Sequence, residues 1–180
     1  LGMAQPRRMT IRTLAAPLLA CGLCALPSIA LADTAGAAHD AEQQIARIKA
    51  LDDVGPMLNA VIAYDPKAPT HASEAEAAGL PLAGRTVLVK DNIETAAGSL
   101  ALKDNATGRD APMIALLRAA GGVILGKTNL SEWANIRSNS STSGWSAVGG
   151  LTKNPHATDR NACGSSSGSG AAVAAGFAWA

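Results

Sequence analysis

The chain has 180 residues, enough for one domain with its own hydrophobic core. It is rich in alanine and glycine, and only 3% of its residues are aromatic. The formal net charge is +1, but Arg7, Arg8 and Arg12 are the only charged residues before Asp33, so residues 33–180 carry a net charge of −2. This balance argues against a surface that binds nucleic acid.

Residues 1–32 have the features of an export signal. The basic stretch "RRMTIR" precedes an apolar stretch that Pro17, Gly22 and Pro27 interrupt, and "ALA" at residues 30–32 resembles a cleavage site between small residues. We therefore expect a mature chain that starts at Asp33 and is periplasmic or secreted. A membrane-spanning helix is the less favoured alternative because of the two prolines and the cleavage site.

Two other export routes stay open. The pair Arg7-Arg8 permits a twin-arginine signal, and "LLAC" at residues 18–21 permits a lipoprotein acylation site. Removal of residues 1–32 takes Cys21 and Cys24 with it, so Cys163 is left without a partner for an internal disulfide.

The mature chain alternates helical and strand patterns. Residues 33–40 are expected to form a flexible leader. Helices are predicted at 41–53 with Asp40 as N-cap, at 70–78, at 111–120 with Asp110 as N-cap, within 127–138 and at 171–180. Strands are predicted at 58–64, 86–89 and 123–126. This order indicates an α/β fold built on a central sheet.

Lys90 is the first candidate for chemistry. It ends the apolar run at residues 86–89 and precedes the turn formers Asp91 and Asn92. A partly desolvated lysine in its neutral form can act as a general base toward a serine hydroxyl. The alternative is a solvated lysine at the end of a strand.

The second candidate is "GSSSGSG" at residues 164–170. Glycines let the backbone approach a ligand closely, and hydroxyls both donate and accept hydrogen bonds, so adjacent serines can relay a proton. The alternative is a flexible linker, but the apolar helix predicted directly after it argues against one.

A third pattern, "GGVILGKT" at residues 121–128, matches the phosphate-loop motif of nucleotide-binding proteins. Its interior, Val123–Leu125, favours a strand, and a strand cannot wrap phosphates with its amides. Nucleotide binding is thus a disfavoured alternative, and Lys127 is expected to cap strand ends or hold a loop. His39, His71 and His156 are scattered, so no metal site is predicted.

Together, "VLVKDNI", "GKTNLSEWANIRS", "SGWSAVGG" and "CGSSSGSG" resemble the amidase signature family, most closely its peptide-amidase-like branch. The resemblance runs from about Ile45 to the end of the chain. It implies an α/β/α sandwich on a mixed central sheet, incomplete in this chain, and a Ser-cisSer-Lys triad that needs no metal and no organic cofactor.

By the same resemblance, Lys90 matches the general base and Ser165 matches the bridging serine of the family, which has a cis peptide bond. Gly164, Ser166 and Ser167 would shape or support this loop, and Asn129 of "GKTNLSEWA" would contact substrate. The nucleophilic serine of the family follows the bridging serine by roughly two dozen residues, which lies beyond Ala180. We therefore expect an N-terminal fragment that is inactive by itself.

The resulting hypothesis is an exported amidase that hydrolyses carboxamide bonds through an acyl-enzyme. Its substrate would be a small-molecule or peptide amide, with no nucleic acid and no membrane span after signal cleavage. A non-catalytic exported binding module is the main alternative. A role in a tRNA-dependent amidotransferase is disfavoured because the tRNA substrate is cytoplasmic.

The loop "NIETAAGSLAL" at residues 92–102 is predicted to be a few residues shorter than in the family. The identity of the amide and the oligomeric state stay open.

Overall fold

The structure is a computed structural model that describes residues 36–95 and 108–180. The predicted export signal, and most of the loop at residues 92–102 that is predicted to be short, lie outside the described residues.

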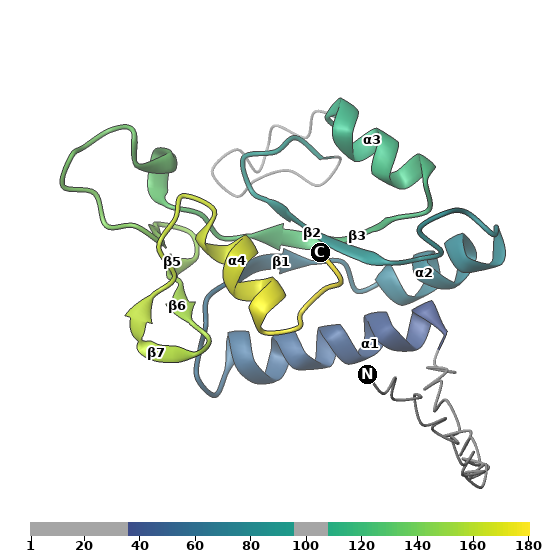
Figure 1. Ribbon diagram of the computed structural model, residues 1–180, viewed down its shortest axis with the longest axis horizontal. Coiled ribbons are helices and arrows are strands. Elements are labelled where there is room, and N and C mark those ends of the chain that lie inside the picture. Colours follow the sequence, from purple (N-terminus) through teal and green to yellow (C-terminus); the bar gives the residue numbers. More distant parts are fainter. Residues whose placement is uncertain (1–35, 96–107) are drawn as a thin grey trace, which may run out of the picture. The chain divides into compact units, whose positions relative to one another are not determined.

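The described elements follow the predicted alternation of helices and strands (Figure 1). In chain order they are α1 (Ala37–Ile48), the π-helical turn η1 (Lys49–Asp53), β1 (Val61–Tyr64), α2 (Ala68–Ala77), β2 (Thr86–Lys90), α3 (Pro112–Ala119), β3 (Val123–Thr128), the 3₁₀ turn η3 (Glu132–Asn135), β4 (Trp145–Ser146), β5 (Gly150–Leu151), β6 (Lys153–Asn154), β7 (Ala157–Asn161) and α4 (Ser167–Ala174).

The central sheet is mixed, as predicted. Its order is β1-β3-β2, with β1 antiparallel and β2 parallel to β3. A parallel pair needs a crossover connection, and α3 lies in the connection between β2 and β3. The last residues also pair with β2, because Leu88 N–H donates to the carbonyl of Ala180 at 2.8 Å and Ala180 N–H donates to the carbonyl of Thr86 at 3.3 Å.

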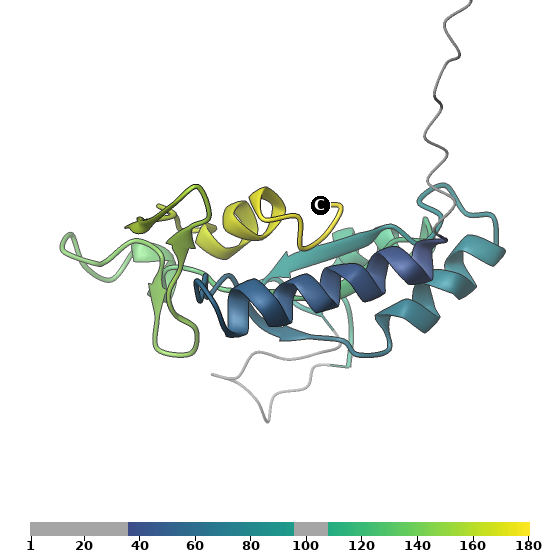
Figure 2. The ribbon, with the colours of Figure 1, turned by 90° about the horizontal axis from the view of Figure 1, so that it is seen from below.

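Helices cover both faces of this sheet. On one face, Leu88 and Leu125 pack against residues of α1, α2 and α4. On the other, Val87, Val89 and Ile124 pack against Ile114 of α3. Figure 1 shows α3 on the opposite side of the strands from α1 and α2, and in Figure 2 α1 lies in front of the strands. This is the predicted α/β/α arrangement.

Burial of branched aliphatic side chains stabilises both layers. Ile48, Ile114 and Leu125 are each less than 2% exposed. Each such side chain contributes about 1.5–3 kcal/mol relative to an exposed position.

Two predicted helix caps are wrong. Gly36 is the N-cap of α1, so Asp40 lies inside the helix and the expected leader ends earlier. Ala111 is the N-cap of α3, and Asp110 instead accepts a hydrogen bond from Arg118 Nε at 2.8 Å. The first helix thus begins before Asp40, and at Asp110 an ion pair with Arg118 takes the place of capping.

The C-terminal helix also differs from its prediction. It begins at Ser167, inside the serine run, and ends at Ala174. Gly176 has a φ of +68°, which ends the helical path, and Phe177 is then completely buried in the core. Phe177 and Ala178 therefore lie in the core instead of extending the helix, whereas Trp179 is half exposed.

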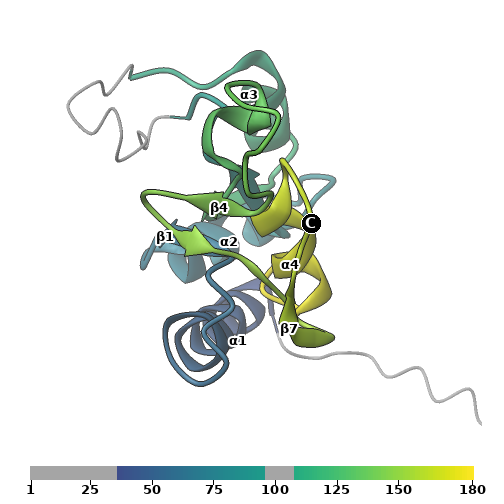
Figure 3. The same cartoon turned by 90° about the vertical axis from the view of Figure 1, so that its left-hand side faces the viewer.

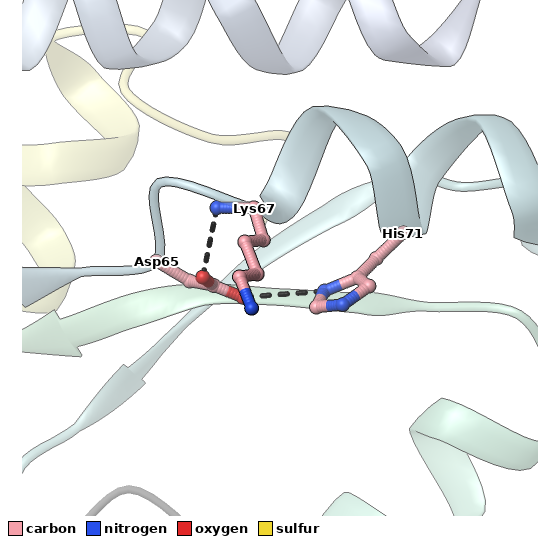
Figure 4. Close-up of polar contacts among 3 residues, drawn as sticks. All are labelled: Asp65, Lys67 and His71. Carbon is pink, nitrogen blue, oxygen red and sulfur yellow. Dashed lines mark hydrogen bonds and ion pairs between the residues drawn. The ribbon is translucent and has the colours of Figure 1, made fainter.

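Asp65 makes several contacts in the turn between β1 and α2. Its Oδ1 accepts a hydrogen bond from Lys67 N–H at 2.9 Å, and its Oδ2 lies 3.2 Å from His71 Nδ1 (Figure 4). The carbonyl of Asp65 also accepts a hydrogen bond from Ala68 N–H at 3.1 Å, at the start of α2. His71 thus has a local structural partner.

Residues 131–166 form an excursion at one end of the sheet, on the left in Figure 1 and facing the viewer in Figure 3. It contains η3 and two short antiparallel pairs, β4 with β5 and β6 with β7. The polar, glycine-rich sequence of this stretch therefore forms an ordered structure that leads into the serine run.

Candidate active site

Lys90 is the last residue of β2 and is half-buried. Its neighbour Val89 packs into the cluster on the α3 face, and side chains alternate along a strand. Lys90 therefore points to the opposite face, where α4 lies. There its Nζ donates a hydrogen bond to Ser165 Oγ at 3.0 Å. The structure thus brings together the two residues that the sequence predicted as partners, 75 positions apart.

The backbone that follows β3 holds the serine loop. Ser131 N–H donates to the carbonyl of Ser165 at 3.0 Å, and Gly168 N–H donates to the carbonyl of Asn129 at 3.0 Å. Residues 129–131 and 165–168 therefore lie side by side. Since β3 is the parallel neighbour of β2, this pairing places Ser165 next to the end of β2. The peptide bond between Gly164 and Ser165 is cis.

Two glycines of the loop are required by close packing. A Cβ on Gly164 would collide with Ser131 Oγ and lie 3.1 Å from Ser143 Oγ. A Cβ on Gly168 would collide with the backbone of Ala60 and Asn129. Any side chain at these positions would push the serine loop away from the end of β3.

The remaining serines have different environments. Ser166 is exposed and is the N-cap of α4, although its side chain makes no capping hydrogen bond. Ser167 is 1% exposed, and its Oγ has no hydrogen-bond partner among the described residues. The hydroxyls of Ser169 and Thr128 share a hydrogen bond at 2.8 Å, which ties α4 to the end of β3.

Asn129 is 1% exposed and is surrounded by protein groups. Its Oδ1 accepts hydrogen bonds from Ser146 Oγ at 2.6 Å and from Leu130 N–H at 2.9 Å. Its Nδ2 lies 3.0–3.1 Å from three acceptors: the carbonyls of Asn59 and Gly150 and Thr152 Oγ1. Groups of the protein thus bond to both the oxygen and the nitrogen of this side-chain amide. These contacts favour a structural role for Asn129 over the predicted contact with substrate.

Lys127 points to the face opposite Lys90, because it pairs with Val89 in the register of β2 and β3. It is 3% exposed, and its Nζ donates to the carbonyl of Ile93 at 2.6 Å. Burial lowers the pKa of Lys127, and the charge of Asp91 acts in the opposite direction. Lys127 thus holds the segment that follows Lys90, as expected for a loop-holding residue.

Six residues of the phosphate-loop pattern, 123–128, form β3, and all of them are buried. The backbone groups of this strand belong to the sheet, which agrees with the sequence argument against a nucleotide site.

Among residues 36–95 and 108–180, no group of three histidine, cysteine, aspartate or glutamate side chains could hold a metal ion. In the same ranges Cys163 is exposed and free. No helix in the described part of the chain is long and apolar enough to cross a membrane.

Sequence reasoning missed Ser131, which is completely buried and contacts the loop that carries Ser165. Its Oγ accepts a hydrogen bond from Gly144 N–H at 2.8 Å. Ser131 belongs to the motif "GKTNLSEWA", but a serine among polar neighbours gives no signal of burial. Only the return of the chain at residues 143–165 creates its environment.

The fold combines a mixed sheet, helices on both of its faces and a lysine–serine pair at the end of β2. The sequence model of the Amidase family matches residues 42–180, and the chain belongs to this family.

Solved structures support this assignment. The native peptide amidase of Stenotrophomonas maltophilia is 47% identical with a TM-score of 0.70, over 79% of this chain and 31% of that one. An amidase family protein from Bacillus anthracis is 36% identical with a TM-score of 0.73, over 81% of this chain and 32% of that one. The chain therefore has the amidase signature fold.

Curated relatives are similar to about two thirds of the chain. A protein of Arabidopsis thaliana named "Probable amidase" is 43% identical over 142 residues, 71% of this chain and 28% of the relative. A glutamyl-tRNA(Gln) amidotransferase component of Akkermansia muciniphila is 43% identical over 121 residues, 64% of this chain and 25% of the relative. The chain thus spans less than a third of the relatives that it matches.

Proposed function

We propose that this chain supplies the general base and the bridging serine of an exported amidase that hydrolyses carboxamides. The observation that carries the proposal is the 3.0 Å contact between Lys90 Nζ and Ser165 Oγ. It places a hydroxyl that can both accept and donate a proton next to an amine at the end of a buried strand. Membership of the amidase family supports the reaction type.

In the proposed reaction, the nucleophile is a serine in a glycine-rich segment that these 180 residues do not include. Ser165 takes the proton of this serine and passes its own proton to Nζ of Lys90. The serine oxygen bonds to the carboxamide carbon, the C–N bond breaks, and the nitrogen leaves as ammonia or an amine with the proton returned through Ser165. Water then attacks the acyl-enzyme by the same relay and releases the carboxylic acid.

The substrate class is a peptide amide or a small carboxamide. The similarity to the peptide amidase of Stenotrophomonas maltophilia supports this class. The basic and apolar pattern of residues 1–32 supports export. Export would separate the enzyme from tRNA, which argues against an amidotransferase role despite the similarity to an amidotransferase component.

The test uses the gene product that contains this chain and a simple carboxamide as substrate. We expect turnover by the longer protein and none by the 180-residue chain. Lys90→Ala and Ser165→Ala should each lower kcat about 100-fold or more, since both remove a member of the proton relay. The matched controls, Lys67→Ala and Ser140→Ala, change exposed side chains and should retain full activity.

Two results would contradict the proposal. One is turnover by the 180-residue chain that depends on Lys90, which would place the nucleophile inside it. The other is a reading frame with no serine in a glycine-rich loop after Ala180, together with no amide turnover. That second result would support the non-catalytic binding module.

A further inference from the structure

Ser131 connects three segments around the serine loop. It lies three residues after the end of β3 and is 0% exposed. Its N–H donates to the carbonyl of Ser165 at 3.0 Å, and its Oγ accepts from Gly144 N–H at 2.8 Å. The same Oγ occupies the space where a side chain on Gly164 would lie.

These contacts act on the peptide unit that carries the bridging serine. Gly164 packs on Ser131 Oγ from one side, and the Ser165 carbonyl accepts from the Ser131 backbone. Gly144 is buried as well, and a Cβ on Gly144 would lie 3.3 Å from the carbonyl of Cys163, the residue before Gly164. A shift of Ser131 or Gly144 would therefore move the peptide that precedes Ser165.

We infer that Ser131 is a positioning residue for the amidase reaction, holding Ser165 Oγ within hydrogen-bond distance of Lys90 Nζ. Ser131 acts through Ser165. The inference rests on the proposed function, because the position of Ser165 matters only if this serine relays a proton. Loss of the Ser131 hydroxyl leaves the buried Gly144 N–H without its acceptor and opens space beside Gly164.

The first test is Ser131→Ala in the gene product that contains this chain. We expect kcat to fall about 10- to 100-fold while KM changes by less than about twofold, because a small displacement of a reacting group slows the chemical step. The pH at which kcat is half-maximal should also move. A purely structural role would scale the whole pH profile by the fraction of folded enzyme and leave its midpoint unchanged.

Thr86→Val is the matched control. Thr86 is 2% exposed, and its Oγ1 accepts a hydrogen bond from Trp179 N–H at 3.2 Å and donates one to Gln44 Oε1 at 2.6 Å. Thr86 begins β2 and therefore lies at the opposite end of this strand from Lys90. The control should lower thermal stability as Ser131→Ala does while retaining the wild-type kcat and pH midpoint. An equal loss of kcat in both variants would overturn the inference.

A second test couples Ser131 to Gly164. Gly164→Ala introduces a methyl group that collides with Ser131 Oγ and should lower kcat. In the double variant with Ser131→Ala this collision is gone, so the combined loss should be smaller than the product of the two single losses. Losses that simply multiply would overturn the inference.

The outcomes separate the two claims. Absence of amide turnover in the wild-type gene product, or full activity of Lys90→Ala, contradicts the proposed function. An active wild type, an inactive Lys90→Ala variant and a Ser131→Ala variant with wild-type kcat contradict only the positioning role of Ser131.

Discussion

At the scale of single residues, Asn129 shows how one buried amide organises the surroundings of a site. Its side chain has partners in the Asn59 segment and in the segment from Ser146 to Thr152, while its carbonyl accepts from Gly168 N–H at the start of α4. A buried amide with all of its hydrogen bonds satisfied fixes the relative positions of these segments.

We predict that Asn129→Asp destabilises the folded protein by about 1–3 kcal/mol or more. The carboxylate has the size of the amide but no N–H groups, so it faces the carbonyls of Asn59 and Gly150 without a donor. Urea denaturation of the gene product measures the loss. The exposed Asn139→Asp variant is the control and should change the free energy of unfolding by less than about 0.5 kcal/mol.

Lys127 and Lys90 lie on neighbouring strands but point to opposite faces of the sheet. Lys90 donates a hydrogen bond to a serine hydroxyl, and Lys127 donates one to a backbone carbonyl in the protein interior. Burial lowers the pKa of Lys127 from its ordinary value of 10.5. Between that lowered value and 10.5, the unfolded chain binds more protons on this group than the folded chain does.

We therefore predict that Lys127 makes a contribution to the free energy of unfolding that rises with pH across this range. In Lys127→Met this contribution is absent, so the stability of the wild type relative to the variant should increase as the pH is raised toward 10.5. Urea denaturation at a series of pH values measures the difference. A difference in stability between wild type and Lys127→Met that does not change with pH would contradict the prediction.

At the scale of elements, α4 illustrates the competition between helix propensity and packing. Its first turn contains Gly168 and Gly170, and both are poor helix formers compared with alanine. Gly168 lies against the backbone of Ala60 and Asn129, whereas no atom lies within 4 Å of a Cβ on Gly170. Close packing therefore requires a glycine at position 168, whereas position 170 has room for a side chain.

We predict that Gly168→Ala destabilises the protein by about 1–3 kcal/mol, because the collision with the end of β3 outweighs the gain in helix propensity. Gly170→Ala should stabilise it by about 0.5–1 kcal/mol. Thermal and urea denaturation of the two variants measure the changes. Equal changes in both variants would show that α4 does not pack on β3 as closely as described.

At the scale of the whole molecule, a three-stranded sheet covered by helices on both faces carries the candidate site at the end of β2. The site needs β2, the exit of β3 and the loop before α4 together. The candidate site therefore forms only when the α/β/α packing is complete. This holds whether the proposed exported chain folds before or after translocation.

If the protein is exported as proposed, we predict that the mature chain begins at Asp33. N-terminal sequencing or mass spectrometry of the protein from the periplasm or the culture medium measures this. Replacing Ala30 and Ala32 with tyrosine should block cleavage and retain the full precursor, since signal cleavage requires small residues at these positions. A mature protein that still contains residues 1–32 in wild type would contradict the export proposal.

The elements with a strong local pattern were predictable from the sequence. The apolar run before Lys90, the glycine pair after α3 and the β-prone residues of 123–126 all lie where expected. Helix ends were less predictable, because a side chain that could cap a helix can form a hydrogen bond or ion pair with another residue instead. Asp110 has Arg118 as a partner eight residues later, and this ion pair takes the place of capping.

The amino-acid sequence by itself determined the α/β class, because the order of helix and strand patterns is a local property of the chain. The pairing of Lys90 with Ser165 came from the resemblance of its motifs to the amidase signature family. Only the tertiary structure decided that Asn129 is enclosed by protein, that Ser131 supports the serine loop and that α4 begins inside the serine run. These features depend on contacts between segments distant in the chain, since burial and hydrogen-bond partners arise only when residues 143–168 return to the end of β3.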